Sequence, residues 1–181
     1  EGISAEQAIE FILDKEPLFA VGEKYKYTDT GYLLAGLVIE KATGKTYYGE
    51  VRRRILDPLA LTQTTPSDHR RLPGLVSGYL PKNNPYGLPA KIMSDDNVLL
   101  FNPAQEWTGG GFVTNAGDLA VYAKALYEGE IIQGDYLQKL LAVKPTTQGK
   151  AYPAYGLGQG MNMTDFGLAY GHNGWIPGYT S

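Results

Sequence analysis

The 181-residue chain contains no cysteine and only two histidines, His69 and His172. Without cysteine the chain can form neither disulfide bonds nor zinc sites built from thiolates, although this does not decide the compartment. Two histidines are too few for a metal site with several histidine ligands. The acidic pair Asp95 and Asp96 has no histidine nearby in the sequence, so we do not expect it to bind metal. The sequence therefore predicts no metal site and no cofactor.

Long hydrophobic runs and an excess of positive charge are also missing. No apolar stretch approaches the roughly 18 residues that a membrane-spanning helix needs. The formal net charge is -3 at pH 7, whereas a protein that binds the nucleic-acid backbone needs a positive surface. We therefore expect neither a membrane span nor nucleic acid as a partner.

The composition is that of an ordinary globular protein. Hydrophobic residues make up 43% of the chain and charged residues 19%, which is not typical of a disordered segment. A chain of 181 residues is long enough for one domain with a sizeable core.

Helical patterns with recognisable ends cover much of the chain. Ser4 and Gln7 have the spacing of a capping box, and Gly44 and Gly129 suit the left-handed position after a helix. Asn115 is a credible cap for a later helix, because its side chain can accept a hydrogen bond from the first turn. The predicted helices cover residues 5 to about 15, about 30–43, 47–57, about 116–128 and 135–143.

Strand patterns appear only near the end of the chain. Residues 156–163 and 168–172 predict two short strands that turn through residues 164–167. Residues 66–105 have weak periodicity and are punctuated by prolines, and long irregular segments in compact domains are often functional. Two interpretations of this segment stay open, because it could lie over a catalytic cleft or be an ill-ordered connection.

Two short motifs contain the residues best suited to chemistry. We call Tyr27-Thr28-Asp29 the tyrosine motif and His172-Asn173-Gly174 the histidine motif. A phenol can act as a base if nearby cations lower its pKa from about 10. A histidine can bind a substrate carboxylate or polarise a base, and a glycine lets the backbone approach a ligand closely.

A structural interpretation of each residue stands beside the functional one. Tyr27 could be an aromatic residue that packs at a helix entry, and Asp29 could cap that helix. His172 could be a hydrogen-bonding residue next to a hairpin. Neither motif decides between the two interpretations by itself.

The run from Tyr27 to Gly44, with the histidine motif, resembles the serine β-lactamase and penicillin-binding-protein-like hydrolases. That family includes class C β-lactamases, esterases and D-aminopeptidases. The resemblance extends from about Leu18 to Tyr179. It implies that Tyr27 is the catalytic base of a Y-x-N motif. It also implies that the histidine motif replaces the family's K-T-G motif on a strand edge, where His172, Asn173 and Gly174 bind substrate.

The chain departs from the family pattern at Asp29, where the family usually has asparagine. An amide can donate a hydrogen bond to a substrate carbonyl, whereas an ionised carboxylate only accepts. Asp29 could still hold a catalytic lysine by charge, so we keep it as a catalytic candidate beside Tyr27. The substitution makes β-lactam hydrolysis less favoured and leaves esterase or peptidase activity open.

The family's nucleophile motif, S-x-x-K, is missing. No serine of the chain has a lysine three residues later. We therefore expect residues 1–181 to be a partial β-lactamase-like domain that is inactive by itself and lacks the nucleophile segment and the C-terminal strands. Its fold should be a mainly α fragment of the α+β family fold, with a small antiparallel β remnant. Its exposed apolar surface should favour self-association.

The resemblance implies that the parent protein is a serine hydrolase that acylates itself with a small-molecule ester, a D-amino-acid peptide or a β-lactam. The alternative is a non-catalytic relative that binds a peptide or a peptidoglycan-like ligand, and Asp29 favours this alternative. A periplasmic or extracellular location is implied by the resemblance alone.

Overall fold

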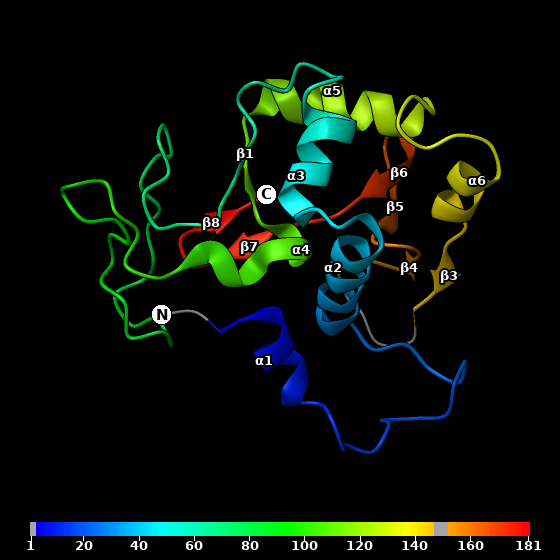
Figure 1. Ribbon diagram of the computed structural model, residues 1–181, viewed down its shortest axis with the longest axis horizontal. Helices are drawn as coiled ribbons and strands as arrows, with labels where there is room; N and C mark the ends of the chain where they lie inside the picture. The colour runs from blue at the N-terminus through cyan, green and yellow to red at the C-terminus, as the bar shows by residue number, and fades with distance from the viewer. Residues whose placement is uncertain (1–2, 147–151) are drawn as a thin grey trace. The chain divides into compact units, whose positions relative to one another are not determined.

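The computed structural model describes residues 3–146 and 152–181 (Figure 1). The chain divides into two compact units. The first consists of Glu1–Leu13, Asp29–Val121 and Gly174–Ser181, and the second of Asp14–Thr28 and Tyr122–Asn173. The expectation that residues 1–181 form one partial domain stays a prediction.

Helix α1 (Ala5–Glu10) of the first unit begins at the predicted capping box. The Ser4 N–H donates to Gln7 Oε1 at 2.8 Å, and the Gln7 N–H donates to Ser4 Oγ at 3.2 Å. The predicted end near Lys15 is wrong, since the helix stops at Glu10. The next residues, Phe11–Leu13, are exposed, and a short helix gains little from extending through residues that remain exposed.

Helix α2 (Thr30–Thr43) lies where it was predicted and ends at Gly44, which has a φ of 66°. Gly36 of this helix lies directly against Trp107 and Thr108. A Cβ at Gly36 would lie 2.5 Å from Thr108 Cγ2 and 2.7 Å from the Trp107 ring. Trp107 and Thr108 begin helix α4 (Trp107–Gly110), which lies beside α2 in Figure 1. Helix α2 therefore packs through a glycine.

The next predicted helix is present but changes its geometry. Helix α3 (Tyr47–Val51) continues into the π-helical turn η1 (Arg52–Leu56). The carboxylate of Glu50 in α3 is buried and accepts hydrogen bonds from Arg53 at 2.8 Å and Arg54 at 2.6 Å. A π-helical turn is rare, appears mostly as a single turn inside a helix and is not visible in a hydrophobic pattern.

The long irregular segment contains most of the first unit's core and is not an ill-ordered connection. Leu72, Ile92, Met93 and Leu99 form a buried cluster. Backbone hydrogen bonds replace regular strands here, since the Leu99 N–H donates to Arg70 O at 2.9 Å and the Leu100 N–H to Ile92 O at 3.0 Å. Its position over a cleft stays a prediction.

Short elements complete the first unit. Strand β1 pairs antiparallel with β2, and β7 pairs antiparallel with β8. The bounds are β1 (Thr65–Pro66), β2 (Phe112–Val113), β7 (Trp175–Ile176), β8 (Tyr179–Thr180) and the 3-10 helix η2 (Pro103–Glu106).

Helix α5 (Ala116–Tyr127) contributes residues to both units. Asn115 caps it as predicted, because its Oδ1 accepts the Asp118 N–H at 2.8 Å. Gly129, with a φ of 84°, follows its end.

An antiparallel sheet with the order β3-β4-β5-β6 lies in the second unit, together with helix α6 (Asp135–Leu141) (Figure 1). The predicted hairpin is the pair β5 (Gly160–Thr164) and β6 (Gly167–Gly171). Strand β5 begins later than predicted because a turn intervenes, in which the Gly156 N–H donates to Gln159 O at 2.8 Å. Strands β3 (Lys144–Pro145) and β4 (Ala154–Tyr155) complete the sheet.

Among residues 3–146 and 152–181, no helix is both long and apolar enough to cross a membrane.

Candidate functional site

Tyr27 and His172, which are far apart in the sequence, lie together in the second unit. Their ring centroids are 5.8 Å apart and the rings are inclined by 39°. Tyr27 ends the irregular segment that precedes α2, and His172 directly follows β6. Both side chains are exposed and can therefore meet a substrate.

Three further tyrosines surround this pair. Tyr155 meets both rings edge-on, at 6.1 Å from Tyr27 and 5.7 Å from His172. Tyr152 lies 5.6 Å from His172, and Tyr25 lies 5.6 Å from Tyr155. We call Tyr25, Tyr27, Tyr152 and Tyr155 the tyrosine cluster. The cluster fixes the approach of Tyr27 to His172 through aromatic edges and faces.

The hydrogen bond of His172 determines which ring nitrogen carries the proton. Its Nδ1 lies 2.6 Å from the carbonyl oxygen of Asn173. A carbonyl oxygen can only accept, so Nδ1 carries a hydrogen and donates it to Asn173. The Asn173 N–H donates to the hydroxyl of Tyr152.

Gly174, the last residue of the histidine motif, belongs to the first unit. Its N–H donates to Ser181 O at 3.0 Å, and the Ser181 N–H donates back to Gly174 O at 3.0 Å. A Cβ at Gly174 would overlap Ser181 Oγ. The two hydrogen bonds extend the pairing of β7 with β8, and the glycine leaves room for the Ser181 hydroxyl.

Asp29 also belongs to the first unit, at the start of α2. Its backbone is helical, with φ -83° and ψ -14°, and within the described residues its side chain makes no capping hydrogen bond. An N-cap side chain normally needs an extended backbone to reach the free N–H groups. Asp29 thus occupies the N-cap position, as one interpretation of the sequence allowed, but its side chain does not cap the helix by a hydrogen bond.

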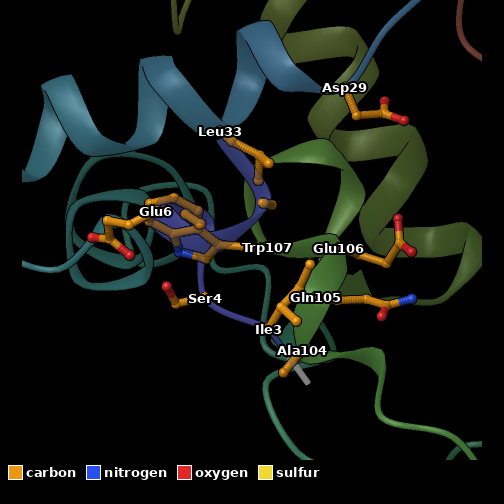
Figure 2. A pocket seen from close by; sticks show the side chains of 11 residues that line it. Ile3, Ser4, Glu6, Asp29, Leu33, Ala104, Gln105, Glu106 and Trp107 are labelled. Carbon is orange, nitrogen blue, oxygen red and sulfur yellow. The ribbon is translucent and has the colours of Figure 1, made fainter. Parts of the chain in front are cut away.

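Asp29 lines a pocket of about 400 Å³ in the first unit, together with Leu33, Gln105, Glu106 and Trp107. Figure 2 shows the carboxylates of Asp29 and Glu106 on the same side of this pocket. Burial raises the pKa of Glu106, and the nearby charge of Asp29 raises it further. The pocket therefore presents two carboxyl groups, and the pKa of one of them, Glu106, is raised.

Trp107 enters this pocket from a strained backbone, with φ 33° and ψ -107°. Such a conformation costs on the order of 1–3 kcal/mol in a non-glycine residue and persists only where its surroundings hold it. The contact of its ring with Gly36 is one such restraint.

The boundary between the two units falls inside both motifs, after Thr28 and after Asn173. The structure brings Tyr27, His172 and Asn173 together in the second unit and places Asp29 and Gly174 in the first. In the described part of the chain, no group of three or more histidine, cysteine, aspartate or glutamate side chains could hold a metal ion.

Sequence reasoning missed the tyrosine cluster and the pocket residues Glu106 and Trp107. The chain has 14 tyrosines, and no spacing separates Tyr25, Tyr152 or Tyr155 from the others. Glu106 and Trp107 directly precede the run Thr108-Gly109-Gly110-Gly111. That glycine run is the one signal that could have directed attention to them.

Comparison with known proteins identifies a family. The family model described as Beta-lactamase matches residues 2–181. Penicillin-binding protein 4* of Bacillus subtilis (strain 168) is 26% identical over 171 residues, which are 90% of this chain and 37% of that protein. A putative D-alanyl-D-alanine carboxypeptidase of Escherichia coli (strain K12) is 28% identical over 93% of this chain and 44% of its own length.

Solved structures show the same similarity. The D-amino acid amidase from Ochrobactrum anthropi SV3, complexed with D-phenylalanine, has a TM-score of 0.82 and 26% identity over 99% of this chain and 53% of its own. A D-stereospecific amidohydrolase from Streptomyces sp. has a TM-score of 0.80 and 29% identity over 97% of this chain and 51% of its own. The chain thus spans about half the length, or less, of these relatives.

Proposed function

The chain belongs to the beta-lactamase family, and we propose that it is part of a longer serine hydrolase that works through an acyl-enzyme intermediate. The substrate would be an ester, a D-amino-acid peptide or amide, or a β-lactam. The names of the relatives, which include an amidase and a carboxypeptidase, support the amide-bond substrates. The β-lactamase-like fold, with helices and small antiparallel sheets, agrees with this proposal.

The observation that carries the proposal is the contact between Tyr27 and His172. A phenol needs a nearby positive charge to become a phenolate at neutral pH. The lysine of the S-x-x-K motif would supply this charge and favour the charged form of Tyr27, which would then accept the proton of the attacking serine. His172 would afterwards be placed to contact the substrate.

The remaining motif residues have supporting roles in the proposal. Asn173 and Gly174 would present backbone groups to the substrate, and the absence of a side chain at Gly174 permits a close approach. Asp29 would hold the lysine of the nucleophile motif by charge.

The nucleophile would lie outside these 181 residues, since none of the serines present is followed by lysine at the required spacing. Acyl transfer needs an activated hydroxyl as well as a base. Residues 1–181 alone should therefore be inactive.

A second candidate function is a non-catalytic relative that binds a peptide or a peptidoglycan-like ligand. It is favoured by Asp29, which cannot donate a hydrogen bond as asparagine would. Burial and the charge of Asp29 raise the pKa of the neighbouring Glu106, and the protonated form of this side chain could donate one. Binding without turnover would then replace acyl transfer.

The first test is to read the complete reading frame that contains this chain and to look for S-x-x-K. The full-length protein should then be labelled by a serine-directed fluorophosphonate, whereas residues 1–181 alone should not. Tyr27→Phe should slow labelling by about 100-fold or more, the contribution of a general base. The exposed Tyr136→Phe is the matched control and should label at the wild-type rate.

Two results would overturn the proposal. A complete reading frame without S-x-x-K would support the binding protein instead. Labelling of the Tyr27→Phe protein at the wild-type rate would remove Tyr27 from the role of base.

A further inference from the structure

We propose that Tyr152 is a positioning residue that holds the end of β6 and the histidine motif in place for the reaction. The kinetic part of this inference rests on the proposed hydrolase function, whereas its structural part does not. Tyr152 would act through His172 and Asn173 rather than on the substrate.

Tyr152 contacts both residues that it would position. Its hydroxyl accepts the backbone N–H of Asn173. Its ring lies 5.6 Å from the ring of His172, with an inclination of 46°. One side chain thus restrains the backbone that follows His172 and the imidazole itself.

The ring of Tyr152 packs against Gly160 of the hairpin formed by β5 and β6. A Cβ at Gly160 would overlap the Tyr152 ring, so only glycine permits this placement. Gly160 is paired with Gly171, the last residue of β6 before His172. The ring therefore contacts the pair of strands β5 and β6, and the histidine motif directly follows β6.

The backbone around Tyr152 is anchored on its other side. Thr146 Oγ1 donates to Tyr152 O at 2.6 Å, and the Thr146 N–H donates to Pro153 O at 3.0 Å. Thr146 directly follows β3, which pairs with β4. These two hydrogen bonds restrain the backbone from which the Tyr152 side chain reaches Asn173.

The ring also joins His172 to the proposed base through Tyr155. Tyr152 and Tyr155 lie 5.8 Å apart, and Tyr155 meets Tyr27 edge-on. A displaced Tyr152 would therefore disturb the relation of His172 to Tyr27. Small displacements of groups around a reacting centre can cost large factors in rate.

The structural test is NMR spectroscopy of the full-length protein with isotopically labelled histidine. The His172→Gln variant lacks the His172 signals and thereby assigns them. Tyr152→Phe keeps the ring and removes only the hydroxyl, so it should shift the His172 ring signals while the melting temperature changes little. Its kcat/KM should fall about tenfold, near the upper range for the loss of one hydrogen bond. Tyr136→Phe again serves as the control.

Gly160→Ala provides an independent variant, because its Cβ would push the Tyr152 ring away. It should shift the same His172 signals in the wild type and cause little further shift in a Tyr152→Ala background. Gly171→Ala on the paired strand is the matched control, since its added Cβ would meet no described atom within 4 Å outside its own chain neighbours.

The outcomes separate this inference from the proposed function. Unchanged His172 signals in both Tyr152→Phe and Gly160→Ala would overturn the positioning role. The positioning role would also be overturned if the shifts of the His172 signals caused by Gly160→Ala and by Tyr152→Ala added fully in the double variant. Shifted signals in a protein that no serine probe labels would support the positioning role and contradict the hydrolase.

Discussion

Glu50 is a charged side chain inside the first unit, with only 4% of its surface exposed. Hydrogen bonds from Arg53 and Arg54 hold its pKa at about 2, well below the usual 4.5. Both arginines are on η1, and Lys45 lies 3.9 Å away. A buried carboxylate is tolerated when such partners satisfy it.

This pairing predicts a pH dependence of stability. Because the pKa of Glu50 is lower in the folded state, its stabilisation is present above pH 4.5 and is lost as the pH falls towards about 2. Melting temperatures of the wild type and Glu50→Gln should therefore differ most at neutral pH and converge in acid. The exposed Glu16→Gln is the control, and a difference that does not change with pH would contradict this role.

The candidate site was predictable at some residues and not at others. Tyr27 and His172 were identified because each belongs to a motif, and the structure places their rings together. Tyr152 has no such context, since its importance comes from contacts with Asn173 and Gly160 that are distant in the sequence. The failure of the Asp29 side chain to cap α2 depends on local backbone angles that residue type does not determine.

At the scale of elements, helix α2 shows a contact that only glycine permits. Trp107 and Thr108 approach so closely that a side chain at Gly36 would overlap them. The apolar residues Leu34 and Val38 of the same helix are exposed. Packing of α2 against α4 therefore depends on a missing side chain rather than on an apolar stripe.

The two glycines of α2 give a matched pair of variants. Gly36→Ala should destabilise the protein by about 1–3 kcal/mol, because it overpacks the contact with Trp107. Gly31→Ala should be neutral or stabilising by up to about 1 kcal/mol, since its Cβ would meet no described atom within 4 Å outside its chain neighbours and the backbone of its own helix. Chemical denaturation of both variants would measure this, and equal effects would argue against the contact.

Element boundaries followed the sequence where a local signal sets them. Gly44 ends α2 and Asn115 caps α5 by contacts within a few residues. The early end of α1 depends on the exposure of Phe11 and its neighbours, which is a matter of long-range packing. The core in residues 66–102 was missed for the same reason, since it is built without regular periodicity.

At the scale of the whole molecule, β6 is an end strand of the second unit's sheet as far as the described residues show. Met163, Phe166 and Leu168 on this hairpin are exposed. An open strand edge beside exposed apolar side chains is a site at which chains associate.

We therefore predict that residues 1–181 self-associate at micromolar concentration. A Met163→Lys and Phe166→Lys variant should shift the mass measured by light scattering towards the monomer. Val21→Lys changes an equally exposed apolar residue outside the sheet and should have little effect. A wild-type chain that is monomeric under these conditions would contradict the prediction.

The division into two units has a consequence for spectroscopy. Both tryptophans of the chain, Trp107 and Trp175, belong to the first unit, whereas the tyrosine cluster belongs to the second. Selectively excited tryptophan fluorescence would thus follow the melting of the first unit, while amide hydrogen exchange along β5 and β6 would follow the second. If the two measurements gave the same transition, the polypeptide would unfold as one cooperative body, although the tryptophans report on one unit and the β5 and β6 amides on the other.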